Sequence, residues 1–210
     1  AHRVGKLAAL IFIETGASIE DCLWIEAAAK LLDVGYAELP REILTKPAGL
    51  TPAEVDLVRS HPASGAIMIG ADTPPLARAA DLVRAHHEQW DGSGYPQGLA
   101  AEAIPFEARV ATLADVFDAL THQRPWRKAY GTQQSLQIIE DRAVTHFDPK
   151  LVAILSRTVV RLEREHGNLE AFLSSGARAS PALTLRSRLL ASLTVDSAVE
   201  AGRTETTAPT

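Results

Sequence analysis

The chain has 210 residues, 46% of them hydrophobic and 22% charged, and a formal net charge of −5. That length suits one domain, or a domain with a tail, and the charge is too mild for an electrostatic binder of nucleic-acid polymers. A single cysteine excludes an intrachain disulfide and fits a reducing cytoplasm, and no apolar run reaches the roughly 18 residues of a membrane span.

Helical signals dominate the N-terminal part of the chain, and strand signals are nearly absent. Residues 3–13 read as the end of a helix that carries four apolar residues on one face, Val4, Leu7, Ala8 and Ile11. Ser18 with Asp21 resembles a capping box that begins the next helix, and Gly35 is expected to end that helix. Residues 36–50 look irregular.

A strong helix start follows at Thr51. Pro52 stands at the first helical position and Glu54 at the third, which together are typical of a capped helix N-terminus. Two valines and a histidine share the inward side of this segment: Val55, Val58 and His61.

A helix that starts at Pro74 or Pro75 leads to two adjacent histidines. Its apolar residues recur at helical spacing: Leu76, Ala79, Ala80 and Val83. Extending that stripe reaches His86 and His87, so at least one imidazole ring should lie at the C-terminal end of the buried face. For a lone histidine, a core residue bonded to a backbone carbonyl would be the better interpretation.

The segment 88–99 changes this interpretation of the two histidines. Gly92, Gly94 and Gly98 allow backbone angles that other residues avoid, and Pro96 stiffens the loop. Imidazole and carboxylate groups together are the ligand set of a divalent transition metal. The histidine pair followed by this glycine-rich loop therefore favours a metal site.

The helix that opens at Pro105 carries two stripes. The first is apolar and consists of Phe106, Val110, Leu113, Phe117 and Leu120. The second leads from alanines into acids and consists of Ala108, Ala111, Asp115, Asp118 and His122. We expect burial on both sides, which requires partners for the carboxylates, although a solvated acidic face is the alternative. The cationic group at residues 124–128 suits a phosphate, or forms a solvated loop.

The sequence predicts an all-α fold, a bundle of about seven or eight helices. Asp148 with Pro149 begins the last core helix. Beyond that helix the chain becomes rich in serine, alanine and threonine, a composition typical of disorder. We therefore expect one domain over residues 1–170 and a low-complexity, disordered tail over residues 171–210.

Candidate ligands stand near the ends of separate predicted helices. These residues are Asp33, His61, His86, His87 and Asp115. Single ligands from several helices can converge in the core of a bundle. A pair of metals there could activate water and stabilise an in-line phosphoryl displacement, with a carboxylate such as Asp33 bridging them.

A set of motifs spread over roughly residues 2–165 makes the pattern specific. They are Ile43-Leu44-Thr45-Lys46-Pro47, His61-Pro62 with Gly65, His86-His87-Glu88, Asp91-Gly92, Gly94-Tyr95-Pro96, Gly98-Leu99, Asp115-Val116-Phe117-Asp118-Ala119-Leu120, Arg124-Pro125 and Phe147-Asp148-Pro149. In these motifs the chain resembles the HD-GYP family of bacterial second-messenger signalling. The resemblance implies an HD-domain-like helical bundle with a metal-site cleft, holding iron or manganese, that hydrolyses cyclic di-GMP to the linear dinucleotide or GMP.

The resemblance also implies roles for individual residues. The implied metal ligands are Asp33, His61, His86, His87 and Asp115, of which Asp33 and Asp115 are also the implied catalytic carboxylates. The implied substrate-binding residues are Asp118, Arg124, Arg127 and Tyr95. The loop around Tyr95 can also contact diguanylate cyclase domains in this family, and an upstream receiver or sensory domain is expected.

Three departures from the family pattern weaken the expected chemistry. Leu32 precedes Asp33 where the family has a ligating histidine, and Tyr36 stands where the family has a lysine. The family's first metal histidine would fall one residue before Ala1. We therefore expect about one metal instead of two or three, and impaired turnover. A catalytically inactive module that binds cyclic di-GMP or a partner protein is the alternative, and a helical scaffold without a ligand is the third possibility.

Overall fold

The computed structural model describes residues 1–123 and 127–175. The regular structure of these residues is helical apart from isolated β-bridge residues, among them the pair Ala143 and Phe147, which confirms the all-α prediction. The α-helices are α1 (His2–Glu14), α2 (Ile19–Ala28), α3 (Arg41–Leu44), α4 (Pro52–Arg59), α5 (His61–Ile69), α6 (Pro74–Ala85), α7 (Phe106–Thr121), α8 (Thr132–Glu140), α9 (Pro149–His166) and α10 (Leu169–Ser174). Short 3₁₀ helices cover Ala29–Leu31 (η1), Val34–Glu38 (η2) and Ala101–Ala103 (η3).

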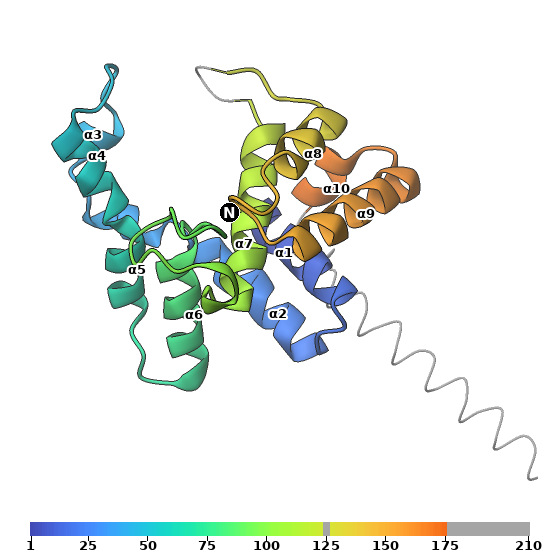
Figure 1. Ribbon diagram of the computed structural model, residues 1–210, viewed down its shortest axis with the longest axis horizontal. Helices are drawn as coiled ribbons and strands as arrows, with labels where there is room; N and C mark the ends of the chain where they lie inside the picture. Colours follow the sequence, from blue (N-terminus) through green and yellow to red (C-terminus); the bar gives the residue numbers. More distant parts are fainter. Residues whose placement is uncertain (124–126, 176–210) are drawn as a thin grey trace, which may run out of the picture.

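Helices α1 and α7 lie at the centre of the bundle (Figure 1). Every residue of α1 from Arg3 to Phe12 is buried, because α2, α7, α9 and α10 all pack against it. The predicted stripe of α1 is confirmed, but the helix is buried on its other faces as well. Such a helix belongs to the interior of a bundle and not to its surface.

Burial of α1 includes the side chain of Lys6, which is fully inaccessible. Its Nζ donates to the carbonyl oxygen of Phe172 at 2.5 Å and to Ser175 Oγ at 2.8 Å, and it lies 4.0 Å from the Phe172 ring centroid. Burial lowers the pKa of the Lys6 ammonium. These contacts attach α10 to α1, and Leu173 of α10 is a core residue beyond the boundary predicted at residue 170.

The structure corrects two local predictions, on Gly35 as a helix end and on residues 36–50 as irregular, and adds one helix. Helix α2 ends at Ala28 and passes into η1, so Gly35 does not end it but lies within η2. Residues 36–50 are not wholly irregular, because they contain part of η2 and the short helix α3. Helix α5 was not among the helices predicted from sequence; Pro62 lies in its first turn, where proline is tolerated.

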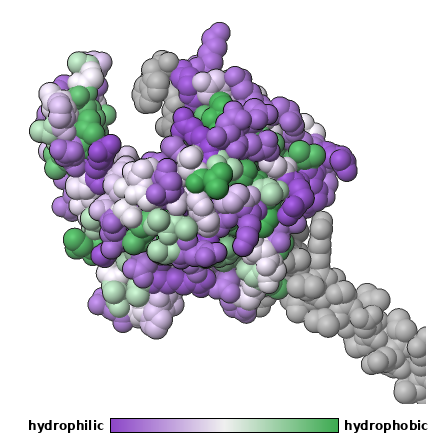
Figure 2. All heavy atoms as spheres, in the orientation of Figure 1, coloured by the Kyte–Doolittle hydropathy of each residue, from purple (hydrophilic) through white to green (hydrophobic). Residues whose placement is uncertain are grey.

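Helices α3 and α4, with their connection, form an arm over residues 41–59 that extends away from the body of the bundle (Figure 1). Neither helix has a buried residue, and Figure 2 shows the arm as a projection from this face. Val55 and Val58, predicted to face inward, are only half-buried. Three of the arm's leucines are well exposed: Leu44 at 49%, Leu50 at 37% and Leu57 at 40%.

The capping box predicted at the start of α4 is confirmed. The Thr51 side chain accepts from the backbone N–H of Glu54, and the Glu54 carboxylate accepts from the Thr51 N–H at 2.7 Å. Lys46 Nζ donates to both Glu54 oxygens, at 2.6 and 2.8 Å. The Lys46 hydrogen bonds, with the Thr51 N–H, lower the pKa of Glu54 from 4.5 to about 2.

Glu54→Gln is expected to lower the free energy of unfolding at neutral pH, because the charge-assisted bonds to Lys46 and Thr51 are weakened. The contribution of a carboxylate with a depressed pKa is present above its unfolded pKa and is lost as the pH falls through the folded value. The difference between the variant and the parent should therefore shrink between pH 4.5 and about 2. Urea unfolding measured across this range tests the prediction, with Glu42→Gln on the same arm as the control, and a difference independent of pH would contradict it.

None of the helices in the described part of the chain has the length and apolar character needed to cross a lipid bilayer.

Candidate metal centre

Two buried histidines at helix ends hold their rings in fixed orientations. His61 is the first residue of α5, and its Nδ1 lies 2.7 Å from the Val58 carbonyl oxygen. His86 is the C-cap of α6, and its Nδ1 lies 2.6 Å from the Val83 carbonyl oxygen. Because a carbonyl oxygen can only accept, Nδ1 carries the hydrogen in both rings. The lone pair of each neutral ring is therefore on Nε2.

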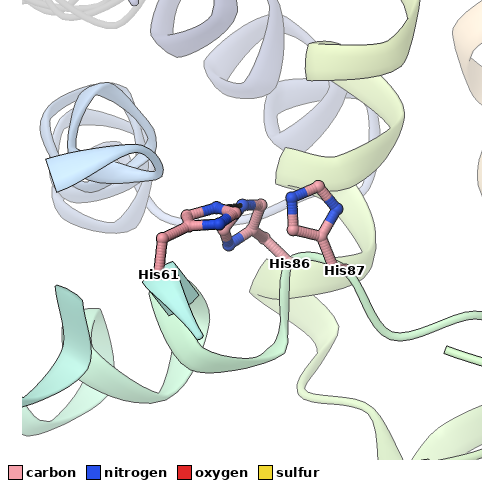
Figure 3. A group of neighbouring side chains, drawn as sticks. All are labelled: His61, His86 and His87. Carbon is pink, nitrogen blue, oxygen red and sulfur yellow. Dashed lines mark hydrogen bonds between the residues drawn. The ribbon is translucent and has the colours of Figure 1, made fainter. Parts of the chain in front are cut away.

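These two lone pairs face each other. The Nε2 atoms of His61 and His86 are 3.3 Å apart, and their side chains are fully or almost fully buried, at 0% and 2% exposure. Two neutral rings with lone pairs directed at each other cannot form a hydrogen bond. His87 brings a third ring, and ligand atoms of all three histidines lie within 4.8 Å of one another (Figure 3). A shared cation satisfies this arrangement.

The electrostatics of the cluster favour the neutral form of two of the imidazoles, those of His86 and His87. Burial, with smaller contributions from neighbouring histidines, lowers the pKa of His86 to about 4 and that of His87 to about 3. Both rings are therefore unprotonated at pH 7, and the neutral imidazole is the form that binds a metal. The threonine hydroxyl of Thr112 on α7 donates to the His86 carbonyl oxygen at 2.6 Å and holds this end of α6 against α7.

Two tyrosine rings enclose the histidines. Tyr36 stacks on His61 with ring centroids 4.2 Å apart, and Tyr95 stacks on His87 at 4.8 Å, each with an interplanar angle of 21°. Burial raises the pKa of both phenols, that of Tyr95 to about 12. Both hydroxyl groups therefore stay protonated, and at Tyr36 a neutral ring occupies the position for which the sequence suggested a lost lysine.

Asp33 approaches the cluster from the segment before η2. Its Oδ1 is 3.8 Å from His61 Nε2, and 64% of its side chain is exposed. This distance is too long for a hydrogen bond but brings the carboxylate to the nitrogen that lacks a hydrogen. The approach depends on Gly35, because a Cβ at that position would overlap the carbonyl oxygen of His61.

Leu32, by contrast, belongs to the main apolar core, at 3% exposure. It therefore contributes to packing beside Asp33 and cannot act as a ligand.

The remaining predicted carboxylates lie around a cavity of about 510 Å³ next to the cluster. Asp115 and Asp118, one helical turn apart on α7, line this cavity together with Asp33. Asp118 has the partner expected of a largely buried carboxylate, because Arg3 Nε donates to its Oδ1 at 2.7 Å. The cavity is also lined by residues at the start of α1, directly after α7 and at the end of α10: Ala1, His2, Arg3, Val4, His122, Gln123 and Ser174.

Of the two predicted cationic substrate contacts, Arg127 is not among the residues that line this cavity. Arg127 lies at the C-terminal end of α7, where its guanidinium donates to the carbonyl oxygens of Ala119 at 2.6 Å and Leu120 at 3.1 Å. It also lies over the Tyr130 ring. Arg127 thus caps the C-terminal end of α7, where the helix dipole favours a cation. Arg124 lies outside the described residues.

Glu88, which follows the histidine pair in a family motif, is a residue of this site that was given no role from sequence. It is 3% exposed, and its carboxylate accepts from the backbone N–H groups of Gln97 at 2.7 Å and Leu99 at 3.0 Å. Gly94 allows the loop to fold back on it, since a Cβ there would overlap the Glu88 backbone. Glu88 therefore fixes the loop that carries Tyr95 against His87. The only sequence signal was its place directly after the histidine pair.

Glu88→Ala is expected to release this loop. Two partly buried N–H groups, those of Gln97 and Leu99, would lose their acceptor, which costs up to about 1–3 kcal/mol each where water cannot replace it. The loop should then be cleaved faster by protease between residues 89 and 99, and metal retention should weaken because Tyr95 no longer supports His87. Glu102→Ala, at an exposed position on η3, is the control. A loop that is cleaved no faster than in the parent would contradict the role of Glu88.

The donor set fits a divalent transition metal. Three imidazoles and nearby carboxylates are the ligands that iron, manganese and zinc accept, and two of the imidazoles have their other nitrogen bound to a carbonyl oxygen. Such support fixes both the tautomer and the direction of the donor atom. The residues therefore match what an HD-type metal centre needs from its protein.

Residues 1–151 match the family described as HD domain. Among curated proteins, the chain is 37% identical to the cyclic di-GMP phosphodiesterase response regulator RpfG of Xanthomonas campestris, covering 84% of this chain and 46% of that protein. It is 35% identical to a cyclic di-GMP phosphodiesterase of Thermotoga maritima, over 78% of this chain and 44% of that protein. It is also 35% identical to the 3'3'-cGAMP-specific phosphodiesterase 3 of Vibrio cholerae, over 80% of this chain and 36% of that protein.

Two solved structures share the fold. The cyclic GMP-AMP specific phosphodiesterase V-cGAP3 of V. cholerae superposes with a TM-score of 0.61 at 19% identity, covering 86% of this chain and 47% of that one. The HD-GYP-type protein Bd1817 of Bdellovibrio bacteriovorus superposes with a TM-score of 0.60 at 16% identity, covering 76% and 51%. The chain thus spans less than half the length of these curated relatives.

Proposed function

This chain belongs to the HD domain family and is of the HD-GYP type, and on that basis we propose that it is a metal-dependent phosphodiesterase acting on cyclic di-GMP. The observation that carries the proposal is the pair of Nε2 atoms of His61 and His86, 3.3 Å apart and both without a hydrogen. Relatives named as cyclic di-GMP phosphodiesterases support the choice of substrate.

His61, His86 and His87 would hold the metal, with Asp33 and Asp115 as the carboxylate ligands. We propose iron or manganese, and about one ion per chain, because Leu32 contributes no donor. A bound divalent ion supplies positive charge that activates water and offsets charge developing on the phosphoryl oxygens. The fixed rings of His61 and His86 keep their donor atoms in place without reorganisation.

The protein's own groups would perform the remaining steps. Asp33, with its largely exposed carboxylate beside His61, would accept the proton of the attacking water. Asp115 and Asp118 face the same cavity, where Asp118 would accept a hydrogen bond from the nucleotide. Tyr36 and Tyr95 would exclude water from two sides of the histidine cluster. The products would be the linear dinucleotide or GMP.

We propose that turnover is impaired. Tyr36 provides no positive charge toward the phosphate, and loss of one electrostatic stabiliser costs about 10²–10³ in rate. Leu32→His alone should restore little, because the imidazole would enter an apolar core at a cost of about 1–3 kcal/mol. The partners proposed on resemblance are diguanylate cyclase domains at the loop around Tyr95 and an upstream receiver or sensory domain. The cytoplasmic location stays a prediction.

The test combines elemental analysis with product analysis. Protein purified without chelators should carry about one transition metal per chain. Manganese- or iron-loaded protein is then incubated with cyclic di-GMP and, separately, with 3'3'-cGAMP, and products are separated by chromatography. Slow formation of linear dinucleotide or GMP supports the proposal. Binding of cyclic di-GMP without any product would favour the inactive module, preference for 3'3'-cGAMP would revise the substrate, and absence of metal would favour a scaffold.

A further inference from the structure

Arg3 is a buried arginine that reaches the candidate site from α1. It is 9% exposed and lines the cavity together with three carboxylates, Asp33, Asp115 and Asp118. Its Nε donates to Asp118 Oδ1 at 2.7 Å, and the side chain of Asp118 is 17% exposed. Among the described residues of the cavity wall, Arg3 is the one permanently charged cation.

The guanidinium is held by more than this ion pair. Its Nη1 donates to Ser174 Oγ of α10 at 3.3 Å and lies 3.7 Å from Glu170 Oε1. Its Nη2 lies 3.5 Å from Thr121 Oγ1 on α7. Contacts at all three guanidinium nitrogens restrict its rotation, so Arg3 meets Asp118 in a fixed geometry.

The charge of this cavity matters for its proposed substrate. A phosphodiester is an anion, and three carboxylates around one cavity repel it. A metal bound by the histidines with Asp33 and Asp115 would offset two of these charges. The third, on Asp118, is offset by Arg3 within the protein.

We propose that Arg3 is a positioning residue that neutralises and orients Asp118, so that an anionic phosphate can enter the cavity and reach the metal. The proposal rests on the proposed metal site and on a phosphoester as the substrate class. It assigns α10 a role as well, because Ser174 and Glu170 contact Arg3 Nη1 while Arg3 Nε binds Asp118.

The test measures binding of inorganic phosphate to the manganese-loaded full chain by titration calorimetry. Arg3→Met should weaken phosphate binding about tenfold, because it removes the permanent cation from Asp118 and leaves it only His122, whose Nδ1 is 3.5 Å from Asp118 Oδ1, among the described residues. Asp118→Asn should tighten phosphate binding, because it frees the Arg3 charge for the anion. The double variant should return close to the parent, and Arg3→Lys should retain most of the affinity.

Arg161→Met is the matched control. Arg161 pairs with Glu14 at the other end of α1, at 2.6 Å, and does not line the cavity. With cyclic di-GMP, Arg3→Met should raise KM about tenfold and change kcat little, since its effect is on entry of the anion. A purely structural role would instead reduce metal content and affect all ligands in the same way.

The outcomes separate the two proposals. Unchanged phosphate binding in Arg3→Met overturns the role of Arg3, and so does a double variant as weak as Arg3→Met. Absence of phosphate binding to the loaded parent also overturns it. If Arg3→Met does not fold, two other variants still test the proposal. Phosphate affinity of Asp118→Asn equal to that of the parent would contradict it. Loss of phosphate binding in Arg3→Lys would also contradict it. Phosphate responses as expected, with no hydrolysis of cyclic di-GMP, would overturn the proposed function alone.

Discussion

His86→Ala is expected to abolish metal retention and to reduce any turnover of cyclic di-GMP by more than about 10²–10³. His86 contributes one of the two Nε2 atoms that face each other at 3.3 Å. Removing it leaves His61 Nε2 without the facing ligand atom. The loss of turnover should therefore exceed the loss that follows from removing a single hydrogen bond to the substrate. Elemental analysis and chromatography of the products measure the two effects on the same sample.

A histidine outside the cluster provides the control. His166, in the last turn of α9, stacks on Phe172 with ring centroids 3.9 Å apart. His166→Ala should keep the metal content of the parent. Full metal content in His86→Ala would show that the histidine cluster does not hold the ion.

Arg109→Met is expected to lower the free energy of unfolding by about 3–5 kcal/mol, the usual cost of removing one partner of a buried ion pair. Arg109 Nη1 donates to Asp148 Oδ2 at 2.7 Å, and the two side chains are 12% and 6% exposed. Arg109 Nε also donates to the Ile104 carbonyl oxygen at 3.1 Å. The variant would leave the Asp148 carboxylate buried with only its bond to the Lys150 N–H.

The control for this prediction is an exposed ion pair of the same chemistry. Arg161 and Glu14 are 42% and 37% exposed, and Arg161→Met should cost less than about 1 kcal/mol. Urea unfolding of both variants gives the comparison. Equal losses of unfolding free energy in the two variants would mean that burial does not determine how much the Arg109–Asp148 pair stabilises the fold.

Apolar periodicity predicted the long helices well. Most residues of the predicted stripes around Val4, Ala80 and Phe117 are buried, because a helix that buries one face must repeat apolar residues at helical spacing. Leu76, the first residue of the stripe around Ala80, is the exception at 40% exposure. Periodicity failed where helices are short: α3 and α10 offer too few residues for a stripe.

The candidate site was predicted in part. Proximity of His61, His86 and His87 was expected from their places at helix ends and from the family resemblance, and the structure brings them together. The position of Arg127 could not be found from sequence, because the path of a loop decides whether a guanidinium reaches a ligand or a helix end. Arg3 and Glu88 were missed because a single charged residue gives no sign of the distant backbone or carboxylate that it meets.

The hydrogen bond that fixes the His61 ring also connects this ring to the arm. The carbonyl oxygen that accepts from His61 Nδ1 belongs to Val58, in the last turn of α4. The arm buries no residue in α3 or α4, so its helices should open locally without unfolding of the bundle. Each opening of that last turn frees the ring, and metal binding disfavours the opening by mass action. Amide hydrogens at the end of α4 should therefore exchange with solvent more slowly when metal is bound, which makes the arm a reporter of metal occupancy at a distance from the cavity.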